Sequence, residues 1–112
     1  MRVVILAVLL VSACSRNHAG DPKLREQAVL EVKRFAYEAY PAWARAHPEK
    51  ACPTKVDELI EYATPSTRDD PWGNPYYMLC GTKLPPSARG IAIYSFGADG
   101  EDDTADDVLS WK

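Results

Sequence analysis

The sequence contains no block of basic residues. Its 13 Lys and Arg are dispersed among 16 Asp and Glu, which gives a formal net charge of −3 at pH 7. Nucleic-acid-binding arms and patches concentrate positive charges in short stretches. The charge pattern therefore gives no reason to expect a nucleic acid as partner and favours a mildly acidic soluble body.

The sequence also lacks an apolar run long enough to cross a membrane. The run from Val3 to Val11 follows a single positive charge at Arg2. A helix that spans a hydrocarbon core of about 30 Å needs roughly 20 apolar residues. A short apolar run after a positive charge is typical of a cleaved signal peptide, which we predict at residues 1–13.

The end of this run resembles a bacterial lipobox. In Val11-Ser12-Ala13-Cys14, a branched apolar residue and two small ones precede the Cys. The resemblance implies cleavage before Cys14 and attachment of diacylglycerol to its thiol. We therefore expect an exported protein, anchored by lipid to the inner or outer membrane and facing the periplasm or the cell surface. A plain secretory signal followed by a chance Cys is the alternative.

Cysteine is scarce, with three in the chain. If Cys14 carries the lipid, Cys52 and Cys80 remain as an even pair in an oxidising compartment, which predicts a disulfide. A bridge that closes a loop of this length contributes about 3–4 kcal/mol to the free energy of unfolding. Two buried free thiols are the alternative.

Residues typical of catalysis are scarce as well. The two histidines, His18 and His47, are far in sequence from the acidic residues near the C-terminus. Ser95 lies inside a predicted strand without an obvious base, which makes it a poor nucleophile. We expect that the protein is not an enzyme.

After cleavage the chain would begin with a polar tether, residues 14–20, followed by one globular domain, residues 21–112. Asp21 and Pro22 are typical of the N-cap and the first position of a helix. Apolar residues at helical spacing then form one stripe, which another element must cover. The stripe consists of Leu24, Ala28, Val32, Phe35, Ala36, Ala39 and Trp43, opposite Glu26, Lys33, Arg34 and Tyr37.

Pro41 interrupts the helical pattern because it has no N–H to donate to the carbonyl of Tyr37. The helix is expected to kink there, with a restart before His47 as the alternative. A second, shorter helix is predicted from Thr54, where Asp57 would complete a capping box. This helix would bury Val56, Leu59, Ile60 and Ala63 and end at residues 64–66.

The second half of the chain predicts a sheet. The strand candidates are Tyr76 to Leu79, Ile91 to Phe96 and Val108 to Trp111, which are rich in aromatic and β-branched residues. The loop between the first two permits a hairpin but no crossover helix, so the pairing should be antiparallel. The kinked helix and the short helix, packed on a three-stranded antiparallel sheet, make an α+β domain.

Two motifs stand out in this half. The first, Asp70-Pro71-Trp72-Gly73-Asn74-Pro75-Tyr76, combines two prolines with a glycine. Such a combination fixes backbone dihedral angles and predicts a rigid corner. A ligand platform at Trp72 is the weaker alternative.

The second motif, residues 97–107, crowds six acidic residues into nine positions. Carboxylates this close repel one another, so an ordered loop would favour Ca²⁺, a hard cation that accepts several oxygen ligands. The spacing is not that of an EF-hand, because Thr104 and Ser110 stand where its Gly and Glu should be. On spacing alone, a solvated acidic loop is favoured over a metal site.

In this order, and separated by a hairpin, the two motifs resemble the major pseudopilin of type II secretion systems, protein G. The resemblance covers roughly Ala28 to Trp111. It rests on the 70–76 motif, on Ile93-Tyr94-Ser95-Phe96-Gly97-Ala98-Asp99-Gly100, and on Asp106-Asp107 leading to Trp111. It implies a pilin-like fold with a C-terminal loop that binds Ca²⁺. The implied ligands are the carboxylates of Asp99, Asp106 and Asp107 and the main-chain carbonyl of Phe96.

The N-terminal part differs from that family, whose members enter the membrane through a long apolar helix that follows a prepilin cleavage site. Here we expect the lipid on Cys14 to serve as the anchor instead. The resulting hypothesis is a calcium-binding pseudopilin-like lipoprotein, a structural or accessory component associated with a type II secretion or type IV pilus machine. The alternative is a free-standing surface lipoprotein that uses the same domain to bind another protein or a glycan.

Overall fold

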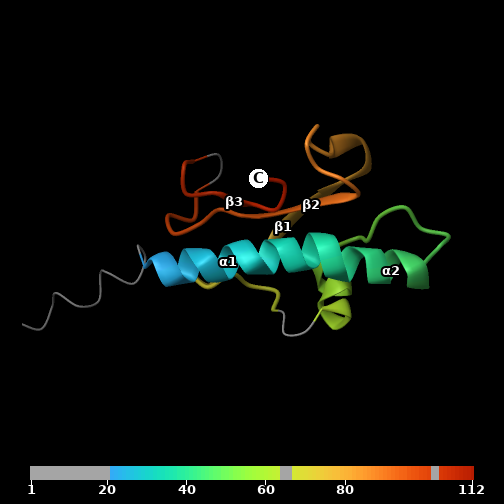
Figure 1. Cartoon of the computed structure of the whole chain (residues 1–112), viewed down its shortest axis with the longest axis horizontal. Coiled ribbons are helices and arrows are strands. Elements are labelled where there is room, and N and C mark those ends of the chain that lie inside the picture. Colours follow the sequence, from blue (N-terminus) through green and yellow to red (C-terminus); the bar gives the residue numbers. More distant parts are fainter. Residues whose placement is uncertain (1–20, 64–66, 102–103) are drawn as a thin grey trace, which may run out of the picture.

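A computed structural model describes residues 21–63, 67–101 and 104–112 of the chain (Figure 1). The predicted signal peptide, tether and lipidation site at Cys14 lie outside the described residues, as does the predicted end of the second helix at residues 64–66. The described residues form a long helical rod beside a small sheet (Figure 1).

The rod consists of α1 (Pro22–Arg34), the π-helical turn η3 (Phe35–Ala39) and α2 (Tyr40–Ala46). Its start is as predicted. Asp21 has an extended backbone and its carboxylate accepts a hydrogen bond of 2.9 Å from the N–H of Lys23, while Pro22 takes the first helical position. The cap satisfies one of the N–H groups that a helix leaves without an internal partner.

The interruption predicted at Pro41 takes the form of the π-helical turn. Pro41 offers no N–H to the carbonyl of Tyr37, and the N–H of Tyr40 bonds to the carbonyl of Phe35, five residues back. The helix therefore widens over one turn and continues into α2. It does not restart.

The apolar stripe of the rod is buried as predicted, except that Leu24 is half-exposed. It packs on one face of the sheet and on the residues of the second helix. The core is formed by Ala28, Val32, Phe35, Ala36, Ala39, Trp43, Val56, Leu59, Ala63, Tyr76, Ile91, Ile93 and Val108. These contacts supply the cover that the stripe requires.

The second helix, η4 (Val56–Tyr62), is a 3-10 helix packed against η3 and α2. The capping box predicted with Asp57 is wrong. The carboxylate of Glu58, one residue later, accepts the hydrogen bond of 2.9 Å from the N–H of Thr54. This hydrogen bond lowers the pKa of Glu58 below its ordinary value, because it stabilises the charged form.

The sheet has the order β1-β2-β3, with antiparallel pairing throughout. Its strands are β1 (Tyr77–Cys80), β2 (Ile91–Ser95) and β3 (Val108–Leu109). Tyr77 pairs with Tyr94, and Tyr94 with Leu109. The α+β fold and the sheet are therefore confirmed.

Strand β3 is shorter than predicted because the side chain of Ser110 enters the ladder. The N–H of Ser110 still donates to the carbonyl of Ile93, at 2.9 Å. The N–H of Ile93, however, donates to Oγ of Ser110 at 3.0 Å, where a regular strand would offer a carbonyl. Regular pairing therefore ends at Leu109.

Side chains of the rod hold the segment after β3. Nζ of Lys33 donates to the carbonyls of Ser110 and Lys112, at 3.2 and 2.9 Å. The hydroxyl of Tyr37 donates to the same Ser110 carbonyl, at 3.1 Å. Lys33 and Tyr37, predicted on the polar side of the helix, therefore bind the C-terminal backbone.

The buried Tyr76 joins the first motif to α1. Its hydroxyl donates a short hydrogen bond to the carboxylate of Glu31, and its ring meets the edge of Phe35 at a centroid distance of 5.5 Å. Burial and the charge of Glu31 raise the pKa of Tyr76 far above its ordinary value. The folded protein keeps this hydroxyl protonated in alkaline solution.

We expect stability to fall above pH 10 in a way that depends on Tyr76. The unfolded chain ionises Tyr76 near pH 10, whereas the folded protein retains the proton. The contribution is therefore complete below pH 10 and is lost by about 1.4 kcal/mol per pH unit above it. Urea unfolding of Tyr76→Phe between pH 9 and 12 should show a shallower decline than the parent. Tyr77→Phe, which removes a hydroxyl that does not contact Glu31, is the control, and equal slopes for Tyr76→Phe and the parent would contradict the prediction.

Candidate functional site

The buried carboxylate of Asp70 joins the two sequence motifs. Its Oδ1 accepts hydrogen bonds from the N–H groups of Trp72 and Asn74, at 3.0 and 2.8 Å. Its Oδ2 accepts a bond of 2.6 Å from the hydroxyl of Ser95, and Oγ of Ser95 accepts the N–H of Gly97 at 2.9 Å. One carboxylate therefore fixes both the rigid corner and the start of the acidic loop.

Gly97 allows the two ends of the acidic loop to approach closely. It has a φ of +78°, and a Cβ there would overlap the backbone of Asp106. The turn closes with a hydrogen bond of 3.2 Å from the N–H of Gly100 to the carbonyl of Gly97. Glycine is required here both by the positive φ and by the lack of space.

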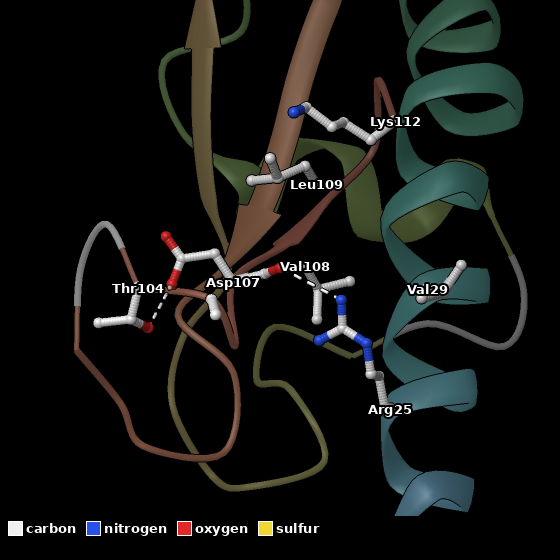
Figure 2. Close-up of a pocket in the computed structure, with 8 residues that line it drawn as sticks. Arg25, Val29, Thr104, Asp107, Val108, Leu109 and Lys112 are labelled. Atoms are coloured by element: carbon white, nitrogen blue, oxygen red, sulfur yellow. Dashed lines mark hydrogen bonds between the residues drawn. The ribbon is translucent and has the colours of Figure 1, made fainter.

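The loop brings the carboxylates of Asp99 and Asp107 to one hydroxyl, that of Thr104. Oγ1 of Thr104 lies 3.3 Å from Oδ1 of Asp99. It lies 3.2 Å from Oδ1 of Asp107, as drawn in Figure 2. The carbonyl of Glu101 lies at 3.2 Å from the same hydroxyl. Oδ1 of Asp99 also accepts the N–H of Glu101, which orients its carboxylate.

Around the hydroxyl of Thr104 there are more acceptor oxygens than hydroxyl hydrogens to bond them. The hydroxyl of Thr104 carries one hydrogen, and three oxygens lie within hydrogen-bond distance of it. Carboxylate, hydroxyl and carbonyl oxygens are the ligands that Ca²⁺ accepts in irregular geometry. The chemistry of the residues present therefore fits a hard cation.

The other two predicted ligands are placed differently. Asp106 is positioned through its backbone, which packs on Gly97 and whose carbonyl accepts a hydrogen bond from Arg25. Phe96 stands between the end of β2 and Gly97, at the entry to the loop. Across the described ranges, which omit Asp102 and Asp103, no three Asp, Glu, His or Cys side chains are grouped as a metal site.

A family model described as "Type II secretion system (T2SS), protein G" matches residues 28–111. This match covers most of the chain and includes both motifs.

The chain belongs to this protein G family.

One relative is the type II secretion system core protein G of Aeromonas hydrophila. It is 50% identical over 43 residues, which are 38% of this chain and 27% of that protein. The match thus spans well under two thirds of the relative's length. No solved structure matches the chain.

Membership of the protein G family fits a structural role more than a catalytic one. Ser95, the nucleophile considered from the sequence, is fully buried, and its hydroxyl is occupied by Asp70 and the N–H of Gly97. These contacts explain the residue as part of the framework of the loop.

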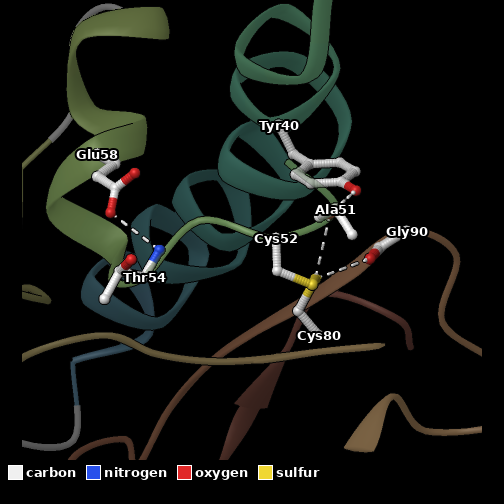
Figure 3. Close-up of a disulfide and its surroundings, with 7 residues drawn as sticks. All are labelled: Tyr40, Ala51, Cys52, Thr54, Glu58, Cys80 and Gly90. Carbon is white, nitrogen blue, oxygen red and sulfur yellow. Dashed lines mark hydrogen bonds between the residues drawn. A yellow bond between two sulfur atoms is a disulfide. The ribbon is translucent and has the colours of Figure 1, made fainter. Parts of the chain in front are cut away.

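A disulfide joins Cys52 to Cys80, the pairing that the even count favoured (Figure 3). Cys52 lies between α2 and η4, and Cys80 ends β1. Close by, the hydroxyl of Tyr40 donates to the carbonyl of Ala51, at 3.1 Å. The bond therefore fastens the connection between the helices to the end of the sheet.

Three contributors to this candidate site were not predicted from the sequence. They are Thr104, the Asp70–Ser95 pair and Arg25, whose guanidinium reaches the loop from α1. Asp70 carried a usable signal, because an Asp before a turn often accepts hydrogen bonds from N–H groups two or more residues ahead. Arg25 carried none, since it is 81 residues from its partner Asp106.

Proposed function

We propose that this protein is a calcium-binding pseudopilin-like lipoprotein, a structural or accessory component associated with type II secretion. The observation that carries the proposal is the family match over residues 28–111. The buried Asp70–Ser95 contact supports it, because it gives the two motifs of that match a shared structural role.

Calcium is the proposed ligand of the acidic loop. The carboxylates of Asp99, Asp106 and Asp107 and the carbonyl of Phe96 would hold it, and the ion would supply the positive charge that crowded carboxylates need. Support comes from the convergence of Asp99 and Asp107 on the hydroxyl of Thr104.

The proposed location is a membrane surface, reached through lipid on Cys14. The lipobox-like sequence supports this anchor. Within the described part of the chain, no helix has the length and apolar character needed to cross a bilayer. With this lipid anchor, the domain is proposed to face the periplasm or the cell surface.

We expect Ca²⁺ to raise the melting temperature of the protein and Asp99→Ala to remove most of that rise. At a free concentration of about 100 times Kd, binding to the native state adds roughly 2.7 kcal/mol to the free energy of unfolding. Thermal unfolding in EDTA and with added Ca²⁺ measures the effect, and Mg²⁺ should substitute poorly because it keeps its water. Glu49→Ala, which removes an exposed acid outside the loop, is the matched control. Identical melting in millimolar Ca²⁺ and in EDTA would end the calcium proposal.

The association with secretion is tested by recovery of the lipidated protein from native membranes. Affinity purification after mild cross-linking should enrich type II secretion subunits over unrelated lipoproteins. A Cys14→Ser form measures how far the enrichment depends on the anchor. Failure of the lipidated protein to enrich any secretion subunit would contradict the proposal.

A second candidate function is the binding of another protein or a glycan without a tie to secretion. The observation that favours it is an aromatic cluster formed by the half-exposed rings of Tyr77, Tyr94, Phe96 and Trp111. Tyr77 and Phe96 stack at a centroid distance of 4.4 Å. Rings of this kind combine apolar area with polar edges and are common at binding surfaces. The same purification would favour this candidate if it recovered one partner with no secretion subunit.

A further inference from the structure

Arg25 links the second turn of α1 to the acidic loop. Its Nη1 donates to the carbonyl of Asp106 at 2.9 Å, and its Nη2 donates to the carbonyl of Asp107 at 3.4 Å. A guanidinium can engage two acceptors at once because its N–H groups form a rigid, planar fork. The backbone of two adjacent acidic residues is thereby tied to a single side chain.

The side chain spans a groove of about 480 Å³ between the helix and the loop. Arg25 and Val29 line this groove from α1, and Thr104, Asp107 and Leu109 line it from the other side (Figure 2). The fork of Arg25 is thus a direct connection across the groove from the helix to the loop.

Asp107 faces in two directions as a result. Its carbonyl points toward Arg25, whereas its carboxylate points away from the helix, toward Thr104 (Figure 2). The two groups share one residue, so a hydrogen bond that fixes the peptide also limits where the carboxylate can lie. Residues that orient a ligand in this way tune metal affinity without touching the ion.

We propose that Arg25 is a positioning residue for the metal loop: by holding the carbonyls of Asp106 and Asp107 on the helix side, it keeps the carboxylate of Asp107 turned toward Asp99. This inference rests on the proposed calcium function. It adds a role for a cation of α1 that lies outside the acidic loop, and it couples occupancy of the loop to the N-terminal half of the helix.

The direction in which Ca²⁺ affinity changes when Arg25 is replaced distinguishes a positioning role from a simple charge effect. Arg25 is positively charged and repels a nearby cation, so charge alone predicts that its removal tightens Ca²⁺ binding. Positioning predicts the opposite, because the loop would lose a preformed orientation. Arg25→Lys separates the two further, since it keeps the charge but replaces the two-acceptor fork with a flexible ammonium.

The experiment is isothermal titration of the full-length protein, in detergent, with CaCl₂. We expect Arg25→Gln to weaken binding about tenfold, in line with other residues that orient metal ligands, and Arg25→Lys to weaken it at least as much. Lys23→Gln is the matched control, because it removes an equal charge from the same end of α1 and Lys23 binds Asp21 through its backbone alone. The control should bind within twofold of the parent.

The melting temperature in EDTA, compared with that in Ca²⁺, shows whether Arg25 has a purely structural role. If Arg25→Gln lowers the melting temperature equally in EDTA and in Ca²⁺, with Kd unchanged, the positioning role is overturned. Tighter binding by Arg25→Gln, with Arg25→Lys like the parent, also overturns it and assigns the effect to charge. If the parent protein does not bind Ca²⁺, the calcium proposal and this inference both fail. If the parent binds Ca²⁺ but the Arg25 variants give one of the two overturning results, only this inference fails.

Discussion

Replacing Asp70 with Ala is expected to lower the free energy of unfolding by about 3–5 kcal/mol, because a buried charged acceptor is removed from three donors. The N–H groups of Trp72 and Asn74 and the hydroxyl of Ser95 would lose their partner together. Asp70 is only 4% exposed, so water would have little access to replace it. Urea unfolding monitored by tryptophan fluorescence measures the loss.

Two further variants make this prediction specific. Asp70→Asn keeps the size and one acceptor oxygen but presents an amide to Ser95, so we expect an intermediate loss. Asp69→Ala removes a neighbouring carboxylate that pairs with Arg68 at 3.7 Å on the surface. Surface pairs contribute about 0–1 kcal/mol. An Asp70→Ala protein as stable as Asp69→Ala would show that the buried network does not hold the corner and the loop together.

Removing the disulfide is expected to cost about 3–4 kcal/mol, the loop-closure value for a bridge of this span. The two cysteines are 28 residues apart, and the segment between them includes η4. Once the bond is absent, the unfolded chain gains conformations that the bridge forbids. Chemical unfolding of the double variant Cys52→Ser/Cys80→Ser measures the effect without leaving a free thiol from the pair.

The parent protein under reducing conditions is the control for this variant. Its unfolding midpoint should coincide with that of Cys52→Ser/Cys80→Ser, because both lack the same bond. Single domains have net stabilities of about 5–15 kcal/mol, so either change removes a large part of the total. A double variant that unfolds at the same denaturant concentration as the oxidised parent would contradict the prediction.

Features set by neighbouring residues could be predicted from the sequence. Asp21 and Pro22 gave the start of α1, and the spacing of apolar residues gave its buried face. The hairpin and its antiparallel pairing followed from short β-rich segments with a loop that excludes a crossover helix. In each case the physical cause lies in residues that are close together in the sequence.

The errors arose where the local geometry differed from the one assumed. The capping box places its acid three residues after the cap, which suits an α-helix. The segment after Thr54 forms a 3-10 helix, and Glu58 accepts its N–H in place of Asp57. Likewise, the third strand ended early because the side chain of Ser110 replaced a carbonyl in the ladder. In both cases a polar group replaces the expected hydrogen-bond partner, and the pattern of apolar residues used to predict the elements does not report such a replacement.

The contacts that build the candidate site are long-range, and no pattern of neighbouring residues indicates which partners meet. Asp70 and Ser95 are 25 residues apart, and Arg25 and Asp107 are 82 apart. Their pairing depends on how the helix, the corner and the sheet are packed. The resemblance to protein G identified the acidic residues, whereas the network that positions them required the structure.

The hydrogen bonds between α1 and the backbone of residues 106–112 affect the order in which the protein can fold during synthesis. Arg25 and Lys33 bind backbone that is synthesised 81 and 79 residues later, respectively, so these bonds cannot form until residues 106 and 112 have been added to the chain. A helix as short as α1 is marginal in water without such support. A product truncated before residue 106 would lack these bonds and the packing of β3 on α1, although the contacts of α1 with β2 could still form. Its first helix would therefore be less stable and more accessible to proteases.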